Sequence, residues 1–247
     1  MKALLAGMGA AEALAHPVFL SGALRGASGG AEVLASFPKA LYVATPAGIA
    51  ALVAPGVGAG PLHVLLDAAP TPQAAEIGFA GAPIWRGALP DPAALAAAVP
   101  LVLEVLAPVA GNNLVPAKRA GAAVLALGRG DLLEVAARLG GAGPGLTPAG
   151  DDALGGVLFA LEAMGCDDDL VAVARQVKTT AISGAFLLWA ARGQALAPVH
   201  DLLAAAVAGD VPAARSAARA LGSVGHSSGA DFAQGLCWGL SRGLGTA

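Results

Sequence analysis

Two patterns of hydrophobic and polar positions divide the chain near Pro90. Before it, short apolar runs are separated by glycine and proline clusters, which is typical of short strands in a small barrel or sandwich. After Asp91 the apolar positions recur at helical spacing and the connections are short, which favours antiparallel neighbours in a helical bundle. The predicted strands are Glu32–Phe37, Ala40–Ala44, Leu62–Asp67, Glu76–Phe79 and Pro83–Arg86.

The first predicted helix starts after Asp91, which caps it, with Pro92 at its first position. Further helices are expected at Ala117–Leu127, Asp131–Leu139, Pro148–Met164, Leu170–Ala191, Pro198–Ala208, Pro212–Leu221 and Gly229–Arg242. We therefore predict an α+β protein with two domains. A strand-rich region, residues 1–90, is expected to pack on a helical bundle, residues 91–247, which carries both motif loops described below.

Composition narrows the class of protein. The chain has 247 residues, 56% of them hydrophobic, and a net charge of −3. A helix-rich folded protein fits these values, whereas a disordered chain or a nucleic-acid-binding protein does not. The longest uncharged stretch, Ala40–Leu66, contains three prolines, so no membrane span is expected there. Because the first residues make only a weak signal peptide, we expect a cytoplasmic protein. The isolated Cys166 and Cys237 are expected to be buried free thiols.

The first of two glycine-rich loops covers residues 143–152, Gly-Pro-Gly-Leu-Thr-Pro-Ala-Gly-Asp-Asp, and leads into an apolar helical pattern. Thr147 is expected to cap that helix, with Pro148 after it. Backbone N–H groups at such a helix start can bind an anion or a carbonyl oxygen. The candidate substrate-binding residues of this loop are Gly143, Gly145, Thr147 and Gly150.

The second loop covers residues 225–231, Gly-His-Ser-Ser-Gly-Ala-Asp. Ser228 and Asp231 have the spacing of a capping box, which is a purely structural interpretation. Capping does not require His226, whose ring could transfer a proton or bind an oxyanion. Ser227, Ser228 and Gly229 are the candidate substrate-binding residues here.

The acidic residues link the two loops. Aligning Thr147–Leu161 with His226–Leu240 pairs Asp152 with Asp231, and a duplication is one explanation that this alignment leaves open. Helix capping would account for only one of the adjacent Asp151 and Asp152, because neighbouring side chains point about 100° apart on a helix. We therefore expect the loops to meet around one hollow. The candidate catalytic residues are Asp151, Asp152, His226 and Asp231.

Other polar and glycine positions have structural interpretations. Thr179, Thr180 and Ser183 either bond to their own helix or direct hydroxyls at the same site. Gly235, Gly239 and Gly243 form a strip that we interpret as a helix-packing surface. His63 and His200 are expected to be structural.

The two motifs together resemble the AllH-like family, a bacterial family formerly of unknown function. One member is counted as a subunit of oxamate carbamoyltransferase in allantoin breakdown. The similarity is specific from about Leu139 onward and includes the segment Thr179–Ser183. It implies an α+β protein of purine-derived nitrogen metabolism that works with hetero-subunits. The carbamoyl-phosphate signatures of aspartate and ornithine transcarbamoylases are missing, so their mechanism is not carried over.

The leading hypothesis is carbamoyl transfer between a phosphate and an amide nitrogen of oxamate or a similar small amide. The loop Gly143–Thr147 would hold a phosphate or carbonyl oxygen, and His226 or Asp231 would move the proton. Asp151 or Asp152 would orient His226 or a metal. Three carboxylates repel a phosphate unless a cation intervenes. Mg²⁺ would serve, and the cationic side-chain candidates are Lys118, Arg119 and Arg138.

Two alternatives remain open at this stage. The chain could be a non-catalytic subunit whose loops bind a small acid or amide and stabilise an assembly. It could also be a metal-assisted amide or ester hydrolase, with Asp152 and Asp231 as the metal ligands.

Overall fold

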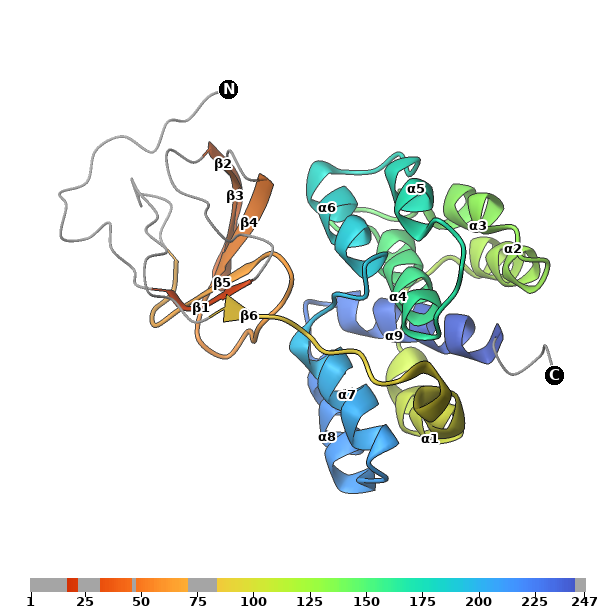
Figure 1. The fold of residues 1–247 in the computed structure, drawn as a ribbon. Helices are drawn as coiled ribbons and strands as arrows, with labels where there is room; N and C mark the ends of the chain where they lie inside the picture. Colours follow the sequence, from red (N-terminus) through yellow and green to blue (C-terminus); the bar gives the residue numbers. More distant parts are fainter. Residues whose placement is uncertain (1–16, 22–31, 46–47, 71–83, 243–247) are drawn as a thin grey trace, which may run out of the picture. The chain divides into compact units, whose positions relative to one another are not determined.

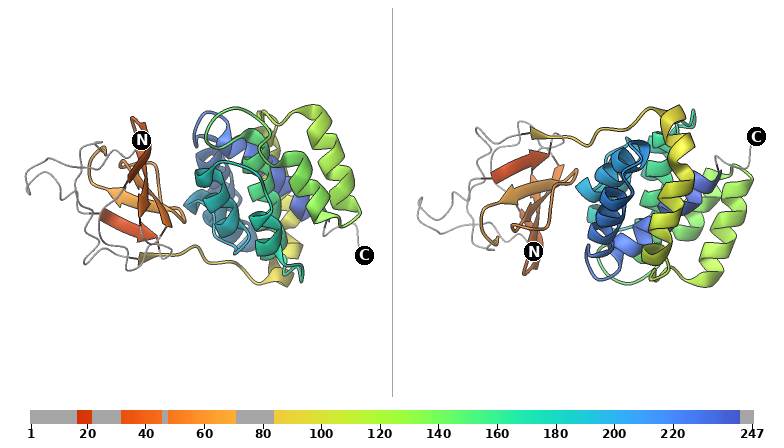
Figure 2. Two further views of the ribbon diagram at one scale, coloured as in Figure 1. Left: turned by 90° about the horizontal axis from the view of Figure 1, so that it is seen from above. Right: turned by 90° about the horizontal axis from the view of Figure 1, so that it is seen from below.

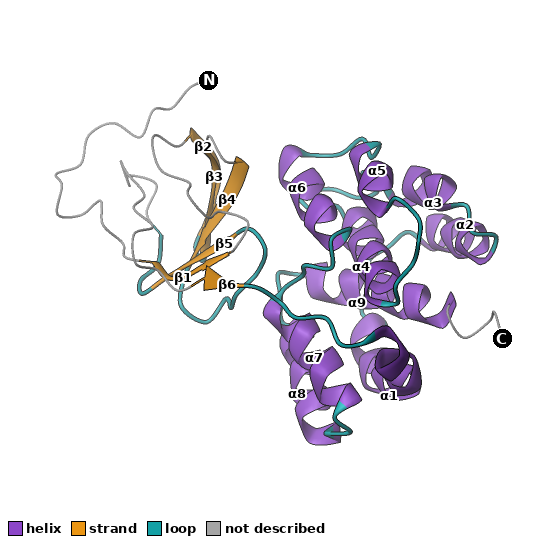
Figure 3. Cartoon of the chain, viewed as in Figure 1, coloured by secondary structure: helices purple, strands orange, loops and turns teal. Residues whose placement is uncertain are grey.

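The computed structural model describes residues 17–21, 32–45, 48–70 and 84–242. The chain divides into two compact units, Met1–Arg86 and Gly87–Ala247. The described elements of the first unit are strands and those of the second are helices (Figures 1 and 3). The predicted α+β class is therefore confirmed. The division lies close to Pro90, where the sequence pattern changes.

The described strands of the first unit form one mixed sheet with the order β2-β3-β4-β5-β1-β6. β2, β3 and β4 are antiparallel neighbours, and β4 pairs with β5 in parallel. β1 is antiparallel to β5 and parallel to β6. The bounds are β1 (Pro17–Ser21), β2 (Glu32–Phe37), β3 (Ala40–Thr45), β4 (Gly48–Val53), β5 (His63–Leu66) and β6 (Ile84–Trp85).

The core of the sheet follows the alternation of its strands. In β3, Leu41 and Val43 are buried while their neighbours are half-buried, as a period of two requires. β2, β3, β5 and β6 lie where the sequence pattern predicts strands. The predicted strand Glu76–Phe79 lies outside the described residues. β1 and β4 were not predicted; in β4, glycine and alanine weaken the strand pattern.

The helical unit follows the predicted pattern at most positions. Its helices are α1 (Pro92–Ala110), α2 (Ala117–Gly128), α3 (Leu132–Leu139), α4 (Ala149–Ala163), α5 (Leu170–Arg175), α6 (Ala181–Ala190), α7 (Ala197–Val207), α8 (Val211–Gly222) and α9 (Ser228–Arg242). Asp91 caps α1 as expected, because its carboxylate accepts hydrogen bonds from the N–H groups of Ala93 and Ala94.

The single helix predicted over Leu170–Ala191 is wrong. The chain leaves the helix after Arg175 and starts a new one at Ala181. Thr180 caps this new helix by accepting a hydrogen bond from the N–H of Ser183, and it donates to the carbonyl oxygen of Leu146 at 2.5 Å. The break therefore arises from hydroxyl bonds to residues far away in sequence.

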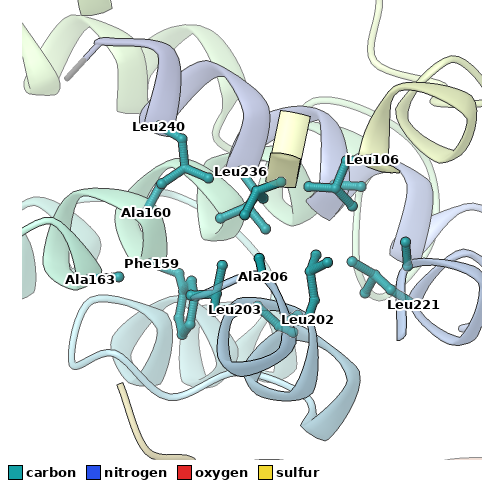
Figure 4. Packing of buried hydrophobic residues seen from close by; sticks show 14 of the residues in the cluster. Leu106, Phe159, Ala160, Ala163, Leu202, Leu203, Ala206, Leu221, Leu236 and Leu240 are labelled. Atoms are coloured by element: carbon teal, nitrogen blue, oxygen red, sulfur yellow. The ribbon is translucent and has the colours of Figure 1, made fainter. Parts of the chain in front are cut away.

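The helices α4 and α9 lie side by side at the centre of the helical unit (Figures 1 and 2). Every residue of α4 except Asp152 and Glu162 is buried. One apolar cluster joins α4 and α9 to α1, α7 and α8 (Figure 4), and a second joins α4 to α2, α3, α5 and α6. A helix buried on all sides is apolar all round, which explains why the α4 sequence has little amphipathic character.

Glycines let α4 and α9 approach closely. A Cβ on Gly156 would overlap the carbonyl oxygen of Phe232, and a Cβ on Gly235 would overlap that of Ala153. Gly239 likewise leaves no room for a Cβ, against Ala160. The predicted packing role is therefore confirmed for Gly235 and Gly239, while Gly243 lies outside the described residues.

These contacts are reciprocal, and they support the duplication that the loop alignment suggests. The step from Asp131 to Asp210 and the step from the start of α4 at 149 to the start of α9 at 228 are both 79 residues. Asp131 and Asp210 cap α3 and α8 in the same way, each after a glycine with positive φ. The helical unit thus contains two related helix–loop–helix segments, whose last helices are α4 and α9.

Among the described residues one helix, α1, is long and apolar enough to cross a membrane by length and composition. Its residues Leu95, Val99, Val102 and Leu106 are buried in the cluster with α7, α8 and α9. We therefore interpret α1 as a core helix.

The two cysteines differ from the prediction in their burial. Both are free, but each is half-buried rather than buried. Burial nevertheless raises the pKa of the Cys237 thiol to about 11, so this thiol is a poor nucleophile near neutral pH.

Candidate functional site

The two glycine-rich loops meet, as expected, but they do not share the hollow beside the first loop, whose lining includes no residue of the second. The hydroxyl oxygens of Thr147 and Ser228 are 3.3 Å apart, although 81 positions separate them in sequence. The start of α6 joins the same region, because the hydroxyls of Thr179 and Ser183 donate to Asp151. The N-terminal ends of α4, α6 and α9 therefore converge at one place.

Thr147 does not cap α4, contrary to the prediction. Pro148 occupies the cap position and makes no side-chain cap bond. The Thr147 hydroxyl instead faces Ser228 of the second loop. In the same way, Asp231 does not close a capping box with Ser228, because Ser228 is already the first residue of α9 and Asp231 has other partners.

Asp151 ties three segments together. It is 1% exposed, and its Oδ1 accepts a hydrogen bond from the N–H of Gly141 at 2.7 Å. Its Oδ2 accepts from the hydroxyl of Ser183 at 2.8 Å and from that of Thr179. Both oxygens are thus occupied, so the contacts of Asp151 hold the first loop against the start of α6 rather than orienting His226.

Asp231 anchors the connection between α1 and α2. Its side chain is fully buried, and its Oδ1 accepts a hydrogen bond from the N–H of Leu114 at 2.6 Å. Asn113 donates to Gln234 of α9 at 3.2 Å and reinforces this contact. Burial raises the pKa of Asp231, while the N–H groups of Leu114 and Val115 and the hydroxyl of Ser227 lower it in part.

Asp152 and Asp231 each keep one buried oxygen without a partner. Among the described residues, the Oδ2 atoms of both are buried and accept no hydrogen bond. Burial raises the pKa of Asp152 well above its usual range, and the hydroxyls of Ser228 and Thr147 offset part of this rise. The negative charges of Asp231 and Asp151 raise it further. The charge of Asp231 in the second loop therefore acts on Asp152 in the first.

An open hollow of about 690 Å³ lies beside the first loop. One wall is the loop itself, with Gly143 and Gly145, and the other is the segment that links α5 to α6, with Lys178 and Thr180. Lys178 is exposed, so its ammonium group is free to move over the hollow. The full lining is Gly141, Gly143, Gly145, Pro148, Val177, Lys178, Thr179 and Thr180.

The first loop offers hydrogen-bond donors at this hollow. Among the described residues, the backbone N–H groups of Gly143, Gly145, Leu146 and Thr147 have no acceptor. Gly143 and Gly145 adopt positive φ values of 128° and 94°, which side chains disfavour. A turn with successive free N–H groups at a helix start is suited to an anion or a carbonyl oxygen.

Two of the predicted substrate-binding glycines have a packing role. A Cβ on Gly150 would overlap the carbonyl oxygen of Leu139, and one on Gly229 would overlap that of Leu221. Both glycines are buried. They occupy equivalent positions in the two repeats, where each lets the preceding helix end close against α4 or α9.

His226 lies in the second loop and is exposed. Among the described residues, no hydrogen bond or ion pair joins it to Asp151, Asp152 or Asp231. The half-buried Ser227 contacts Asp231 through its hydroxyl. The second loop therefore brings Ser227, Ser228 and Asp231 to the meeting point, whereas the ring of His226 faces solvent.

Sequence reasoning missed Leu114 and Lys178. Leu114 contributes only a backbone N–H, which leaves no signal in the sequence. Lys178 stands one position before the two threonines that interrupt an apolar pattern, and that neighbourhood could have indicated it. Two of the cations proposed instead have other partners: Arg138 pairs with Glu134, and Arg119 donates to the carbonyl oxygen of Arg138.

His63 and His200 have structural partners, as predicted. His63 contacts the carbonyl oxygen of Gly58 at 2.8 Å. The His200 ring accepts from the N–H of Ala195 and contacts the carbonyl oxygen of Ala88.

Comparison with known proteins gives one match. Residues 139–240 match the model of the AllH family, described as oxamate carbamoyltransferase subunit AllH. No curated protein and no solved structure matches the chain. The matched segment begins at the end of α3 and includes both loops and the start of α6. Residues 139–240, less than half of the chain, are therefore similar to the AllH family.

Proposed function

We propose that the protein is the subunit of a carbamoyltransferase that acts on oxamate or a similar small amide in purine-derived nitrogen metabolism. The observation that carries this proposal is the meeting of the two loops at the converging starts of α4, α6 and α9. All three helix starts lie within the segment that matches the AllH family.

The hollow beside the first loop is the proposed binding site for the anionic group of a substrate. A phosphate or carboxylate there would accept hydrogen bonds from the free N–H groups of Gly143 and Gly145, next to the positive end of α6. Lys178 supplies a positive charge at the rim. The same contacts would hold oxamate, which carries a carboxylate beside its amide.

Carbamoyl transfer makes a bond from the amide nitrogen to the carbamoyl carbon and breaks the bond from that carbon to the phosphate oxygen. The nitrogen loses one proton, and the phosphate leaves with the bonding electron pair. We assign the proton to one of Asp152, Asp231 and His226. The charge of Asp231 acts on Asp152, and Ser228 lies beside both Thr147 and Asp152. His226 is an exposed residue of the second loop.

The family description as a subunit leads us to propose partner subunits as well. In such an assembly, this subunit would supply the binding site beside the first loop, and partner subunits would supply further catalytic residues. The decisive measurement is phosphate release that depends on oxamate and carbamoyl phosphate, made with this protein alone and with candidate partner subunits from the same genome neighbourhood.

Two variants make the assay specific. Lys178→Ala should raise the KM for the anionic substrate with a smaller change in kcat, because it removes a charge that binds ground state and transition state alike. Arg175→Ala, three positions earlier at the exposed last residue of α5, is the matched control and should behave as the wild type. Asp152→Ala should abolish turnover, and unchanged turnover in that variant would contradict the proposed role of the acids.

A non-catalytic ligand-binding subunit gives a different result. In that case Asp152→Ala would keep the activity of the assembly, while Lys178→Ala would weaken the binding of oxamate to the isolated protein. Calorimetric titration with oxamate separates this outcome from the catalytic one.

A further inference from the structure

We propose that Asp152 and Asp231 together bind one divalent cation of the oxygen-preferring class, such as Mg²⁺ or Mn²⁺, at the junction of the two repeats. The protein would bind this cation without any substrate present, so the proposal does not depend on which substrate the protein uses.

Two buried carboxylate oxygens at this junction have no partner among the described residues. Oδ2 of Asp152 and Oδ2 of Asp231 are both buried and accept no hydrogen bond from any described residue. Buried carboxylate oxygens are nearly always paired, since an unpaired one loses its hydration without compensation. Asp231 is fully buried and uses only Oδ1, on the N–H of Leu114. Because the charge of Asp231 also acts on Asp152, two such oxygens in one region indicate a missing positive partner.

The acids at this junction have no positively charged side chain acting on them in the described chain. The charged groups that act on Asp152 are Asp231 and Asp151, and no lysine, arginine or histidine of the described chain is among them. The positive ends of α4 and α9 supply only partial charge. Three neighbouring carboxyl groups are therefore left without a counter-charge, which a divalent cation would provide.

The polar side-chain atoms around the two acids are oxygens, which suit a hard cation. The groups beside the two acids are the hydroxyls of Thr147, Ser227 and Ser228. All of these are hard oxygen donors, with no cysteine or histidine among them. Mg²⁺ and Mn²⁺ prefer such donors and are commonly held by one or two carboxylates, with water or substrate oxygens completing the shell.

The repeat explains why the two acids lie in the same region. Asp152 and Asp231 occupy equivalent positions, 79 residues apart, at the starts of α4 and α9. The reciprocal contacts of Gly156 and Gly235 bring these two helices together with their starts on the same side. A cation between the acids would lie where the repeats exchange contacts.

The test is to titrate the chelator-treated protein with Mn²⁺ and Mg²⁺. Calorimetry measures the binding, and thermal unfolding measures how the midpoint changes with cation concentration. We expect one site per chain and a rise of the midpoint with cation concentration. Asp152→Asn and Asp231→Asn should each weaken binding at least about tenfold, because each removes a ligand charge while the side-chain shape is kept. In Asp231→Asn the amide oxygen can still accept from the N–H of Leu114.

Asp167→Asn is the matched control, since Asp167 is an exposed acid outside the site, and it should bind the cation as the wild type does.

Without cation, Asp152→Asn should unfold at a higher temperature than the wild type, because it removes a repulsion. Equal responses of the wild type and Asp152→Asn to Mn²⁺ would overturn the proposal. So would a wild type that binds no cation and shows the infrared band of a buried protonated carboxyl group, since the acids would then share a proton. A failed transferase assay would leave the cation result standing.

Discussion

Single residues hold the loops in place, and Asp151 does so most directly. Its carboxylate accepts from the N–H of Gly141 and from the hydroxyls of Thr179 and Ser183. Asp151 is a candidate catalytic residue by sequence, but both of its carboxylate oxygens accept hydrogen bonds that hold the fold together. Its neighbour Asp152, which points in another direction, keeps a buried oxygen free.

We predict that Asp151→Ala lowers the free energy of unfolding of the helical unit by about 3 kcal/mol or more. The variant leaves three donors without their acceptor: the hydroxyl of the buried Ser183, that of the half-buried Thr179 and the N–H of the exposed Gly141. A buried donor left unpaired costs about 1–3 kcal/mol, and an exposed one costs less. Urea unfolding followed by circular dichroism measures the change. Ser183→Ala, which removes one of the three donors, should cost much less. A fully stable Asp151→Ala protein would contradict this role.

At the scale of the elements, the contact between α4 and α9 positions both loops. It depends on glycine at two reciprocal positions, Gly156 and Gly235, where a Cβ would overlap backbone of the facing helix. The glycines cost helix propensity, so the close approach of the helices has to compensate for it.

We predict that Gly156→Ala and Gly235→Ala each destabilise the protein by at least about 1–3 kcal/mol, because the helices must move apart. Gly121→Ala in α2 is the control. That glycine is exposed and a Cβ there meets nothing, so the variant should gain up to about 1 kcal/mol from helix propensity. Thermal or urea unfolding of the three variants tests the prediction, which fails if all three shift in the same direction.

The long apolar helix α1 gives a second prediction at this scale. Val102→Asp should prevent folding, since it buries an unpaired charge against α7, α8 and α9. Ala97→Asp, on the exposed face of the same helix, should be tolerated. Soluble yield and circular dichroism of both variants provide the measurement. Equal sensitivity of the two faces would indicate that α1 is not a core helix of this bundle.

At the scale of the whole molecule, the helical unit begins at Gly87, directly after the sheet unit. Residues of the helical unit fix the position of Gly87 by direct contacts. Gln194 bonds to both the N–H and the carbonyl oxygen of Gly87. His200 contacts the carbonyl oxygen of Ala88 and packs edge-on against Phe159. A Cβ on Gly87 would overlap the His200 ring, so only glycine fits there.

This contact makes stability depend on pH. Burial lowers the pKa of His200 below 6.5, and its backbone hydrogen bonds and the charge of Asp201 offset this in part. The native state therefore favours the neutral ring, whose Nε2 accepts from Ala195. The stabilisation is complete above pH 6.5 and is lost as the pH falls from 6.5 through the lower pKa of the native state.

Urea midpoints measured from pH 8 to pH 5 check this prediction. His200→Gln should have a lower midpoint at pH 8 and a flatter slope than the wild type. His63 is expected to contribute to the remaining slope, because burial also lowers its pKa. An unchanged slope in His200→Gln would contradict the assignment.

Much of the fold could be predicted from the sequence, because local causes set it. Asp91, Asp131 and Asp210 cap helices with their own side chains, and glycines with positive φ end several of them. The two loops were identifiable for the same reason, since glycine, proline and scarce acids stand out in an apolar chain. Long-range bonds were not accessible. The break before α6 depends on the bond from Thr180 to Leu146, and local periodicity predicts one continuous helix there.

The sequence by itself determined the α+β class, most helix and strand positions and the residues worth examining, since periodicity, caps and turns are properties of neighbouring residues. Only the tertiary structure decided how the acids divide their roles. Asp151 accepts hydrogen bonds from Gly141 and Ser183, and Asp231 accepts one from the N–H of Leu114. Asp152 keeps a buried oxygen without a hydrogen bond. That division follows from the packing of α4 against α9 at Gly156 and Gly235, because burial and distance between remote segments set hydrogen-bond partners and charge interactions.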